Sequence, residues 1–512
     1  RRAANARMMI LFMLTLFILV EVCIAAYDVS FAELTALTSY HSTAICSNGD
    51  VVVGGGTTGL IGFPSAGGWD FLVQRFSSTG TLLWSTVWGG TQEDFIKGVS
   101  VDDNDNVFVT GYTRSTLAAN AVALTVANIG SSGNLIYSHD YGGGTANAHD
   151  APNGISLDSA RGVFYVSGYT HSSTFQGLPL NAAIGGFLLK VNCSDGDIIA
   201  TTLYSRRNYA LVFTAVTTDS TGAAWVVGHT TSPSYAGTAS KGDYDIIVHK
   251  FSSSGTSLFS TLLGGTSTDG ASGVTCDYDG NVYVIGTARV SVDSQTFLGG
   301  ISDILVAKYS SDGTKLWSKL VGSAGDDYPV GIAVDSYKGL VYATGYTRTS
   351  SFYGSTSILT ASTPFFLALH SANGDYVYSQ IFPATGNSAA QAQQAQFRGI
   401  ANRGEVLYVT GSTQGHILGV TKPGTMGASA GIVAKFGNGT STIALTRSPT
   451  TVPTFKPSVA PTASPTVDPT FAPTANPSVD PTANPTADPT ASPTMDPTFA
   501  PTAGPTVDPT AN

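Results

Sequence analysis

The sequence predicts an all-β fold: a seven-bladed β-propeller of four-stranded antiparallel blades, followed by a disordered Pro/Thr-rich tail. The composition supports this class, because 58 glycines and only 11% charged residues in a chain of 512 are typical of many short strands joined by turns. Segments that alternate apolar and polar residues between Gly, Asn and Asp indicate hairpins. One such strand, which ends in glycine, recurs seven times at intervals of 56 to 66 residues, and this period indicates a repeat fold. The seven glycines are Gly55, Gly111, Gly168, Gly228, Gly286, Gly345 and Gly411.

The first 26 residues have the anatomy of a secretory signal peptide. Three arginines lie among the first seven residues, an apolar run of twelve covers residues 9–20, and small residues at 23–26 offer a cleavage site. The alternative is a transmembrane anchor, but twelve residues span only about 18 Å of helix, less than a bilayer requires. We therefore expect a secreted chain with no integral membrane span apart from the cleaved segment.

The repeats occupy residues 27–447, and the clearest copy runs from Gly273 to Gly322. It predicts four strands, expected at 273–277, 282–286, 303–308 and 316–321. Each sheet is apolar on both faces and cannot bury itself alone, so we expect radial stacking to bury these faces. We expect the glycine that ends each second strand to let the chain turn with φ > 0. Fourth-strand aromatics such as Trp317 are expected to pack between blades.

Seven copies predict seven blades and a ring that closes where the two ends of the repeat region meet. We expect residues 31–46 and 437–446 to supply strands of the same or adjoining blades at this point. Residues 31–37, FAELTAL, are expected to add a strand to the last blade. A radial arrangement shortens the exposed sheet edges, and we expect the propeller to be a monomer.

Four motifs recur in step with the glycines. The first strand has Gly, two alternating apolar residues and Asp at 273–277, and the second reads Asn-Val-Tyr-Val-Ile-Gly at 281–286. The third has Asp-x-x-Val-x-Lys at 303–308, and the fourth has Leu-Trp-Ser at 316–318. Over residues 41–446 the copies resemble the β-propeller repeat family often called SBBP repeats, most closely in the second, fifth and sixth copies. The resemblance implies a fold and not an activity, because propellers host unrelated functions.

The last segment, residues 448–512, changes composition abruptly. From Pro449 a proline occurs at every fourth position, sixteen times, to Pro509, and most are followed by threonine. Proline fixes φ and removes a backbone donor, which excludes helices and sheet interiors. We expect a disordered, extended and O-glycosylated stalk. A bare linker to a further domain is the alternative that these residues leave open.

Charge and cysteine content exclude several classes of partner and site. A net charge of −10 without a Lys/Arg cluster argues against nucleic acid and anionic membranes as partners. Beyond the signal segment three cysteines remain, Cys46, Cys193 and Cys276, too few for a disulfide framework. No Cys/His grouping has zinc spacing. The sequence therefore predicts no metal, no cofactor and no catalytic residue, and it leaves a protein or glycan partner unidentified.

Two acidic pairs at one repeat position, Glu93 with Asp94 and Asp326 with Asp327, are candidates for ligand contact or acid–base catalysis on the loop face. Because they recur in step with the repeat, we interpret them chiefly as structural groups between blades. Residues 102–106 and 277–281 resemble fragments of calcium loops. We interpret these as turns in which Asp and Asn side chains bond to the local backbone.

His171 and His229 follow the second strands of the third and fourth copies in similar positions. Neighbouring blades would place both on one face, where they would line a shallow ligand site; the alternative is that they are ordinary polar loop residues. Asn192 and Asn438 begin Asn-x-Ser/Thr sequences and are N-glycosylation candidates in a secreted protein.

We interpret the chain as a secreted or cell-surface propeller that acts as a structural or adhesion-like interaction module on an extended stalk. The signal segment, the Pro/Thr-rich tail and the lack of a recognisable nucleophile–base pair support this interpretation. The alternative is an extracellular carbohydrate-active enzyme with its site on the loop face of the propeller. Convergent acidic and aromatic residues from several blades would favour the enzyme.

Overall fold

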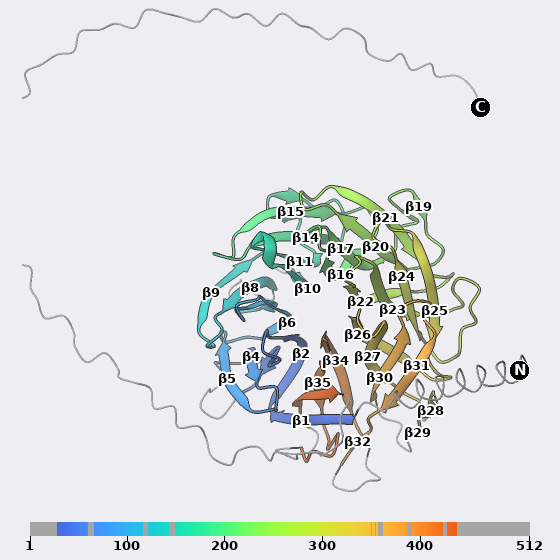
Figure 1. The fold of residues 1–512 in the computed structure, drawn as a ribbon. Helices are drawn as coiled ribbons and strands as arrows, with labels where there is room; N and C mark the ends of the chain where they lie inside the picture. The colour runs from blue at the N-terminus through green and yellow to red at the C-terminus, as the bar shows by residue number, and fades with distance from the viewer. Residues whose placement is uncertain are drawn as a thin grey trace, which may run out of the picture. The chain divides into compact units, whose positions relative to one another are not determined.

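The computed structural model describes residues 28–437, apart from 60–65, 116–120, 143–148, 350, 354, 357–361, 387–391, 405 and 423–427. These residues form seven four-stranded antiparallel sheets in a ring around a central channel (Figure 1). The prediction of a seven-bladed propeller is confirmed. The predicted signal segment, residues 1–26, and the predicted stalk, residues 448–512, lie outside the described residues.

The first four blades follow one another along the chain, and in each the strands run in order from the channel outward. Blade 1 holds β2 (Thr38–Ile45), β3 (Val51–Thr57), β4 (Asp70–Phe76) and β5 (Leu82–Trp88), and blade 2 holds β6 (Asp94–Val101), β7 (Val107–Thr113), β8 (Ala123–Ile129) and β9 (Leu135–Tyr141). Blade 3 holds β10 (Asp150–Asp158), β11 (Val163–Thr170), β14 (Gly185–Asn192) and β15 (Ile198–Tyr204), and blade 4 holds β16 (Leu211–Thr218), β17 (Ala224–Thr230), β20 (Asp245–Phe251) and β21 (Ser257–Leu263).

The remaining blades repeat this plan, except that blade 7 takes its outer strand from the start of the chain. Blade 5 holds β22 (Gly270–Cys276), β23 (Val282–Ala288), β24 (Asp303–Tyr309) and β25 (Lys315–Val321), and blade 6 holds β26 (Asp327–Asp335), β27 (Leu340–Thr347), β30 (Thr363–His370) and β31 (Tyr376–Ile381). Blade 7 holds β34 (Ala395–Arg403), β35 (Val406–Thr413), β36 (Ala430–Gly437) and β1 (Asp28–Ala36). In blade 5 the first strand begins at Gly270, three residues before the predicted start.

Short elements decorate the strand connections. The two-stranded pairs are β12 (Thr174–Phe175) with β13 (Leu178–Pro179), β18 (Ser234–Tyr235) with β19 (Thr238–Ala239), β28 (Ser351–Phe352) with β29 (Ser355–Thr356), and β32 (Ala384–Thr385) with β33 (Ala392–Gln393). One turn of 3-10 helix, η1 (Ser159–Arg161), joins β10 to β11. In the described part of the chain no helix is long and apolar enough to cross a membrane.

The ring closes through strand β1, as the sequence predicted for residues 31–37. β1 pairs antiparallel with β36, and Leu34 lies opposite Ile432. Lys435 donates to the carbonyl oxygen of Ser78 in blade 1 at 2.9 Å, so the last blade is also bonded directly to the first. The outer strand of blade 7 therefore comes from the N-terminal end, and residues 438–446 lie outside the described residues.

Each inner strand carries a β-bulge at the same place. In blade 5, Ala271 pairs with Gly286 and Gly273 pairs with Ile285, so Ser272 has no partner in the ladder. The other six inner strands shift register at the corresponding residue. A bulge re-aims the extra side chain and bends the strand, and here seven bulged residues lie beside the channel.

The seven glycines that end the recurring second strand in the sequence, from Gly55 to Gly411, are called the marker glycines. They face these bulges, which corrects the expectation that they sit in turns. Gly286 lies inside β23, and a Cβ on it would be 2.3 Å from the carbonyl oxygen of Gly270. The corresponding distance is 2.4 Å or less at the other six glycines, and none of the seven has a positive φ. Glycine is required because the bulged inner strand approaches the second strand too closely for a side chain.

Fourth-strand aromatics pack against the next blade, as predicted. Trp317 of blade 5 contacts Gly374 in a turn of blade 6 and donates to the carbonyl oxygen of Ser371 at 3.1 Å. Phe259 and Gly313 make the same contact between blades 4 and 5. The aromatic ring fills the space left by the missing side chain, so neighbouring blades interlock at their rims.

Candidate functional site

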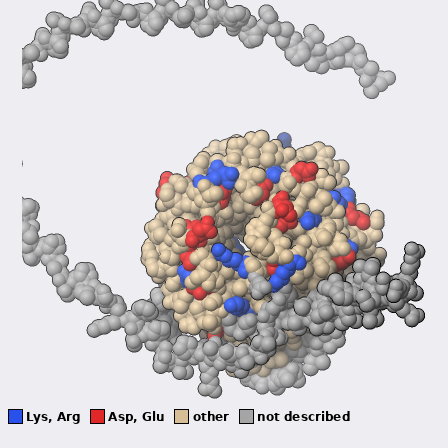
Figure 2. Space-filling view, viewed as in Figure 1, with Lys and Arg blue, Asp and Glu red and all other residues tan. Residues whose placement is uncertain are grey.

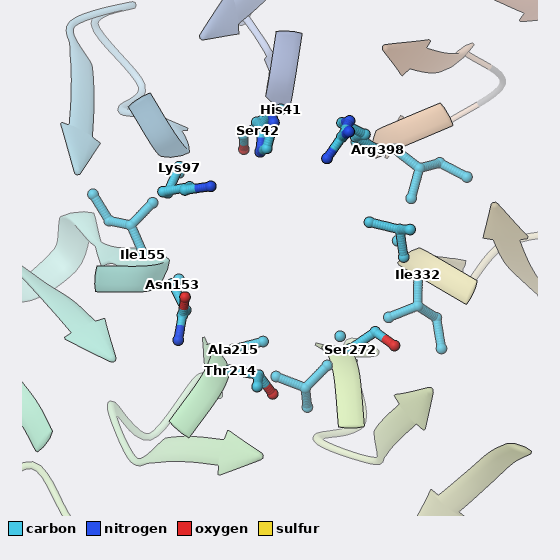
Figure 3. Close-up of a pocket in the computed structure, with 18 of the residues that line it drawn as sticks. His41, Ser42, Lys97, Asn153, Ile155, Thr214, Ala215, Ser272, Ile332 and Arg398 are labelled. Carbon is cyan, nitrogen blue, oxygen red and sulfur yellow. The ribbon is translucent and has the colours of Figure 1, made fainter. Parts of the chain in front are cut away.

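The seven bulged residues line one pocket at the channel, and each comes from the equivalent position in the first strand of its blade. Because each side chain leaves its strand at a bulge, it turns away from the packed sheet faces and toward the channel (Figure 3). These residues, called the channel ring, are His41, Lys97, Asn153, Thr214, Ser272, Val330 and Arg398.

The channel ring lines a pocket of about 400 Å³. This volume lies in the range of small-molecule sites, which is roughly 300–1,000 Å³. Its wall includes two cations and a histidine but no Asp or Glu, although the whole chain has a net charge of −10. Figure 2 shows Lys and Arg atoms at the edge of the channel opening, with Asp and Glu atoms farther out on the same face. The pocket is therefore electropositive within an acidic protein.

Three adjacent blades supply the basic side of the ring. Lys97 and Arg398 lie on either side of His41, with nitrogen atoms directed into the channel (Figure 3). Burial, followed by the charges of Lys97 and Arg398, holds the pKa of His41 well below its ordinary value. Burial and the Arg398 charge lower the pKa of Lys97, and burial also lowers that of Arg398. The site is thus preorganised around positive charge that nothing in its wall neutralises.

Neither cation has a carboxylate within 4 Å among the described residues. Arg398 donates to the Gln396 side chain at 2.8 Å, but its buried Nε atom has no partner there. Lys97 lies over the rings of Phe95 and Tyr112, 5.4 and 5.5 Å from their centroids. Ring faces attract cations more weakly than a carboxylate does, so both groups retain capacity for an anion.

The opposite side of the ring is neutral and polar. Asn153 donates to the carbonyl oxygen of Phe213 at 2.8 Å, and Thr214 donates to that of Val227 at 3.3 Å. Ser272 completes this side (Figure 3). Amide and hydroxyl groups in such an arrangement can exchange hydrogen bonds with a hydroxyl-rich ligand.

Aromatic side chains follow the marker glycines directly in four of the seven blades. Tyr112, Tyr169 and Tyr346 occupy this position in blades 2, 3 and 6, and His229 occupies it in blade 4. Tyr346 stacks on Tyr328 with ring centroids 5.0 Å apart. Tyr112 lies under the Lys97 ammonium, so this half-buried ring adjoins the channel ring.

The four predicted acidic residues lie in two different environments. Glu93 pairs with Arg114 at 3.3 Å and accepts from the Tyr112 hydroxyl at 2.9 Å. Asp94 is fully buried; its oxygens accept from the Thr113 hydroxyl and, at 2.7 Å, from the Gly90 N–H. Contact of either residue with a ligand stays a prediction.

The second acidic pair repeats this division. Asp326 is half-buried and accepts from the Ile301 N–H at 2.8 Å, whereas Asp327 is fully buried and accepts from the Thr347 hydroxyl at 2.5 Å. Asp327 faces Asp303 of the preceding blade across Gly322. The same pairing joins Asp70 with Asp94 and Asp245 with Asp269. The buried members therefore meet between blades, and their contact with a ligand likewise stays a prediction.

The two predicted histidines do not occupy equivalent positions, which corrects the expectation from the sequence. His171 comes three residues after its marker glycine, Gly168, whereas His229 comes one residue after Gly228. His171 lies just beyond β11, with its ring 5.9 Å from that of His149. His229 lies inside β17, directly after Gly228, and its ring centroid is 5.6 Å from that of Tyr244. Burial lowers the pKa of both histidines. They lie on the same side of the propeller but belong to separate aromatic pairs.

The two stretches that resemble calcium loops are turns. Both oxygens of Asp277 accept hydrogen bonds, from the N–H groups of Asp279 and Asn281 at 3.1 and 2.8 Å and from the Asn281 amide at 2.9 Å. Asp102 binds Asn104 and Asn106 in the same way. In the described part of the chain no three His, Cys, Asp or Glu side chains gather as metal ligands.

The two glycosylation candidates differ in what the structure describes. Asn192 ends β14, where its side chain donates to Asp195 at 2.9 Å and accepts from the Ser194 N–H at 3.2 Å. Asn438 lies outside the described residues. Glycosylation of either residue stays a prediction.

Comparison with known families supports the repeat assignment. The family model described as SBBP, beta-propeller repeat, matches residues 83–117, 258–290 and 316–353. These three segments are SBBP repeats. Each runs from the outer strand of one blade through the two inner strands of the next, as from β5 to β7. An SBBP repeat therefore straddles two blades, and its motif residues build the contacts between them.

The chain is similar to several solved structures at low sequence identity. The chain is similar to a quinohemoprotein alcohol dehydrogenase from Comamonas testosteroni, with 12% identity, a TM-score of 0.42, and coverage of 79% of this chain and 67% of that one. It is also similar to the WD40 β-propeller domain of Doa1, with 11% identity, a TM-score of 0.45, and coverage of 81% of this chain and 98% of that one. A third similar structure is the polysaccharide lyase Uly1, with 9% identity, a TM-score of 0.44, and coverage of 78% of this chain and 90% of that one. A search of curated proteins found no significant match.

The sequence analysis missed the channel ring. Each member comes just before the residue that opens the Gly-apolar-x-apolar pattern of the first strand, as Lys97 precedes Gly98 and Arg398 precedes Gly399. A signal was present: this position is polar or charged in six of the seven copies, although it adjoins buried strand residues. A glycine inside the second strand, opposite that position, also indicates a bulge.

Proposed function

We propose that this chain is a non-catalytic binding propeller that takes its ligand in the central channel and is displayed outside the cell on the Pro/Thr-rich stalk. The observation that carries the proposal is the channel ring, in which Lys97 and Arg398 face a pocket of about 400 Å³ without a neutralising carboxylate. Half-buried charge of this kind is costly unless a partner compensates for it. A bound ligand supplies that partner.

The described residues favour binding over catalysis. The pocket wall holds hydroxyl, amide and cationic groups, but no carboxylate or cysteine that could act as a base or nucleophile. His41 is the titratable base in the wall, and it is held neutral between two cations. The extracellular location rests on residues 1–26 and 448–512, whose sequences are typical of a signal peptide and a stalk.

A blocked channel tests the proposal. The full secreted chain is applied to a glycan array and to extracellular matrix polymers, beside a Ser272→Trp variant whose indole fills the channel. Ser254→Trp, at an exposed turn, is the matched control. Binding that is lost in Ser272→Trp and retained in Ser254→Trp supports the proposal. Equal binding by all three proteins, or turnover of a glycan by the wild type, would contradict it.

A further inference from the structure

The channel ring has two chemically different sides, and the difference indicates the class of ligand. Arg398, His41 and Lys97 come from blades 7, 1 and 2, so the positive groups form one continuous arc. Asn153, Thr214 and Ser272 come from blades 3, 4 and 5 and form a neutral arc. A ligand that satisfies both arcs has an anionic group at one end and neutral hydrogen-bonding groups at the other.

Some of the other partly or fully buried cations in the propeller are paired with carboxylates, which the two channel cations are not. Arg75 binds Asp50 at 3.0 Å and Asp105 at 2.8 Å, and Lys250 binds Asp219 at 3.1 Å. Lys97, by contrast, has no hydrogen-bond acceptor and Arg398 Nε has none among the residues described here. Carboxylates thus compensate these two structural cations, whereas none lies within 4 Å of Lys97 or Arg398 among the described residues.

We propose, on the basis of the proposed function, that the channel binds an acidic saccharide and holds its carboxylate between Arg398 and Lys97. Arg suits this role because its planar guanidinium can donate two parallel hydrogen bonds to a carboxylate. The sugar hydroxyls then face Asn153, Thr214 and Ser272.

The pocket size agrees with this class of ligand. A volume of about 400 Å³ is near the lower end of small-molecule sites and suits a single sugar acid rather than a folded polymer. The remaining sugars of an oligosaccharide would lie outside this volume. A simple inorganic anion would use the positive arc but leave the neutral arc unoccupied.

Calorimetry on the full chain tests the inference. The probes are D-galacturonate and D-glucuronate, with D-galactose and D-glucose as neutral counterparts and sodium sulfate as the simple anion. We expect at least one uronate to bind 10-fold or more tightly than its neutral hexose and than sulfate, because charge-assisted hydrogen bonds are about twice as strong as neutral ones. Equal affinity for uronate and hexose would overturn the proposal, as would equal affinity for uronate and sulfate.

Two substitutions locate the site. Arg398→Gln and Lys97→Gln each remove one charge from the positive arc, and each should lower uronate affinity 10-fold or more. Arg207→Gln, on an exposed arginine outside the channel, is the matched control and should bind as the wild type does. Circular dichroism shows whether each variant keeps its fold. If folded Arg398→Gln and Lys97→Gln both bind uronate with wild-type affinity, the assignment is wrong.

The outcomes also separate this inference from the proposed function. If a ligand other than a uronate binds and Ser272→Trp abolishes that binding, the channel is a ligand site and the acidic-saccharide assignment fails. If uronate binds equally to wild type and folded Ser272→Trp, the channel is not the site and both proposals fail. Loss of uronate binding in Ser272→Trp, Arg398→Gln and Lys97→Gln together supports both.

Discussion

Gly286 in the second strand of blade 5 lies so close to Gly270 in the first strand that a Cβ on Gly286 would be 2.3 Å from the carbonyl oxygen of Gly270. This approach is a consequence of the bulge at Ser272. The same relationship holds in every blade. The glycines that define the sequence repeat and the side chains that line the channel are therefore two results of one backbone feature.

Substitution of Gly286 by alanine tests this relationship. The added methyl group forces the two strands apart, and we expect the free energy of unfolding to fall by about 2–4 kcal/mol. Gly270→Ala is the matched control, because the atom nearest to its Cβ is 3.8 Å away, and it should change stability by less than about 1 kcal/mol. Urea denaturation of both variants measures the difference, and equal stabilities would contradict the explanation.

The contact between Phe259 and Gly313 offers a second test, at the rim between blades. Gly313 has φ of 95°, and a Cβ on it would lie 2.4 Å from the Phe259 ring. Gly237 has φ of 88° but no atom within 4 Å, so Gly237→Ala reports the cost of the backbone conformation alone. We expect Gly313→Ala to be less stable than Gly237→Ala by about 1–3 kcal/mol. Thermal unfolding that shows no difference would mean that blade interlocking does not limit stability.

The third-strand lysine joins its own blade to the next one. Lys250 binds Asp219 at 3.1 Å, donates to the Ser311 carbonyl at 2.8 Å and lies 5.0 Å from the Trp225 ring centroid. Lys250→Met should lower the unfolding free energy by about 3 kcal/mol, because it leaves the Asp219 carboxylate buried without its cation. The exposed pair of Lys319 with Asp375 is the control, and Lys319→Met should cost less than about 1 kcal/mol.

Lys250→Met should also change the pH dependence of stability. Burial opposes ionisation of Asp219, but the Thr221 hydroxyl and Lys250 together hold its pKa below the ordinary value. A lowered pKa stabilises the folded protein above the unfolded-state pKa, and the stabilisation is lost as the pH falls. Denaturation curves from pH 3 to 7 should therefore show a smaller loss on acidification for Lys250→Met than for the wild type. Parallel curves would contradict the pairing.

The aspartate pair between blades 5 and 6 predicts the opposite pH dependence. Asp303 and Asp327 are fully buried, and Asp303 Oδ1 has no hydrogen-bond partner in the described structure. Burial, and then the Asp327 charge, raise the pKa of Asp303 to about 6. The folded state thus holds a proton that the unfolded chain releases near pH 4. The resulting stability is complete below pH 4 and is lost as the pH rises through about 6.

An amide at position 303 removes the need for that proton, since it is uncharged at any pH. We expect Asp303→Asn to be more stable than the wild type by about 1–2 kcal/mol at pH 7, with the difference shrinking toward pH 4. The exposed Asp279→Asn is the control and should show no such trend. Comparison with the wild type at each pH cancels the effect of buried histidines such as His249, whose pKa is lowered by burial to about 4. A less stable Asp303→Asn at pH 7 would contradict the raised pKa of Asp303.

Local patterns were sufficient to predict the blades. Alternation, turn residues and the recurrence of Gly286 and its equivalents depend on short-range backbone chemistry, which the sequence displays directly. Strand β1 was also predicted, because FAELTAL has strand character and a ring needs a closing strand. The role assigned to the glycines was wrong because a glycine at the end of a strand pattern was read as a turn, whereas it faces a bulge.

The channel site could not be predicted in the same way. Arg398, His41 and Lys97 are different residue types in three copies of the repeat, so no motif connects them. They meet because the ring brings the last blade next to the first, a contact between residues more than 350 positions apart. Asp303 and Asp327 were missed as a pair because the SBBP repeat straddles two blades, and their contact crosses that boundary.

A crystal structure of the full chain grown with D-galacturonate tests the central claim most directly. The account predicts one sugar in the channel, with its carboxylate oxygens about 2.8 Å from the guanidinium of Arg398 and the ammonium of Lys97, and its hydroxyls toward Asn153, Thr214 and Ser272. A sugar bound elsewhere on the propeller, or a channel filled only with water at saturating galacturonate, would contradict it.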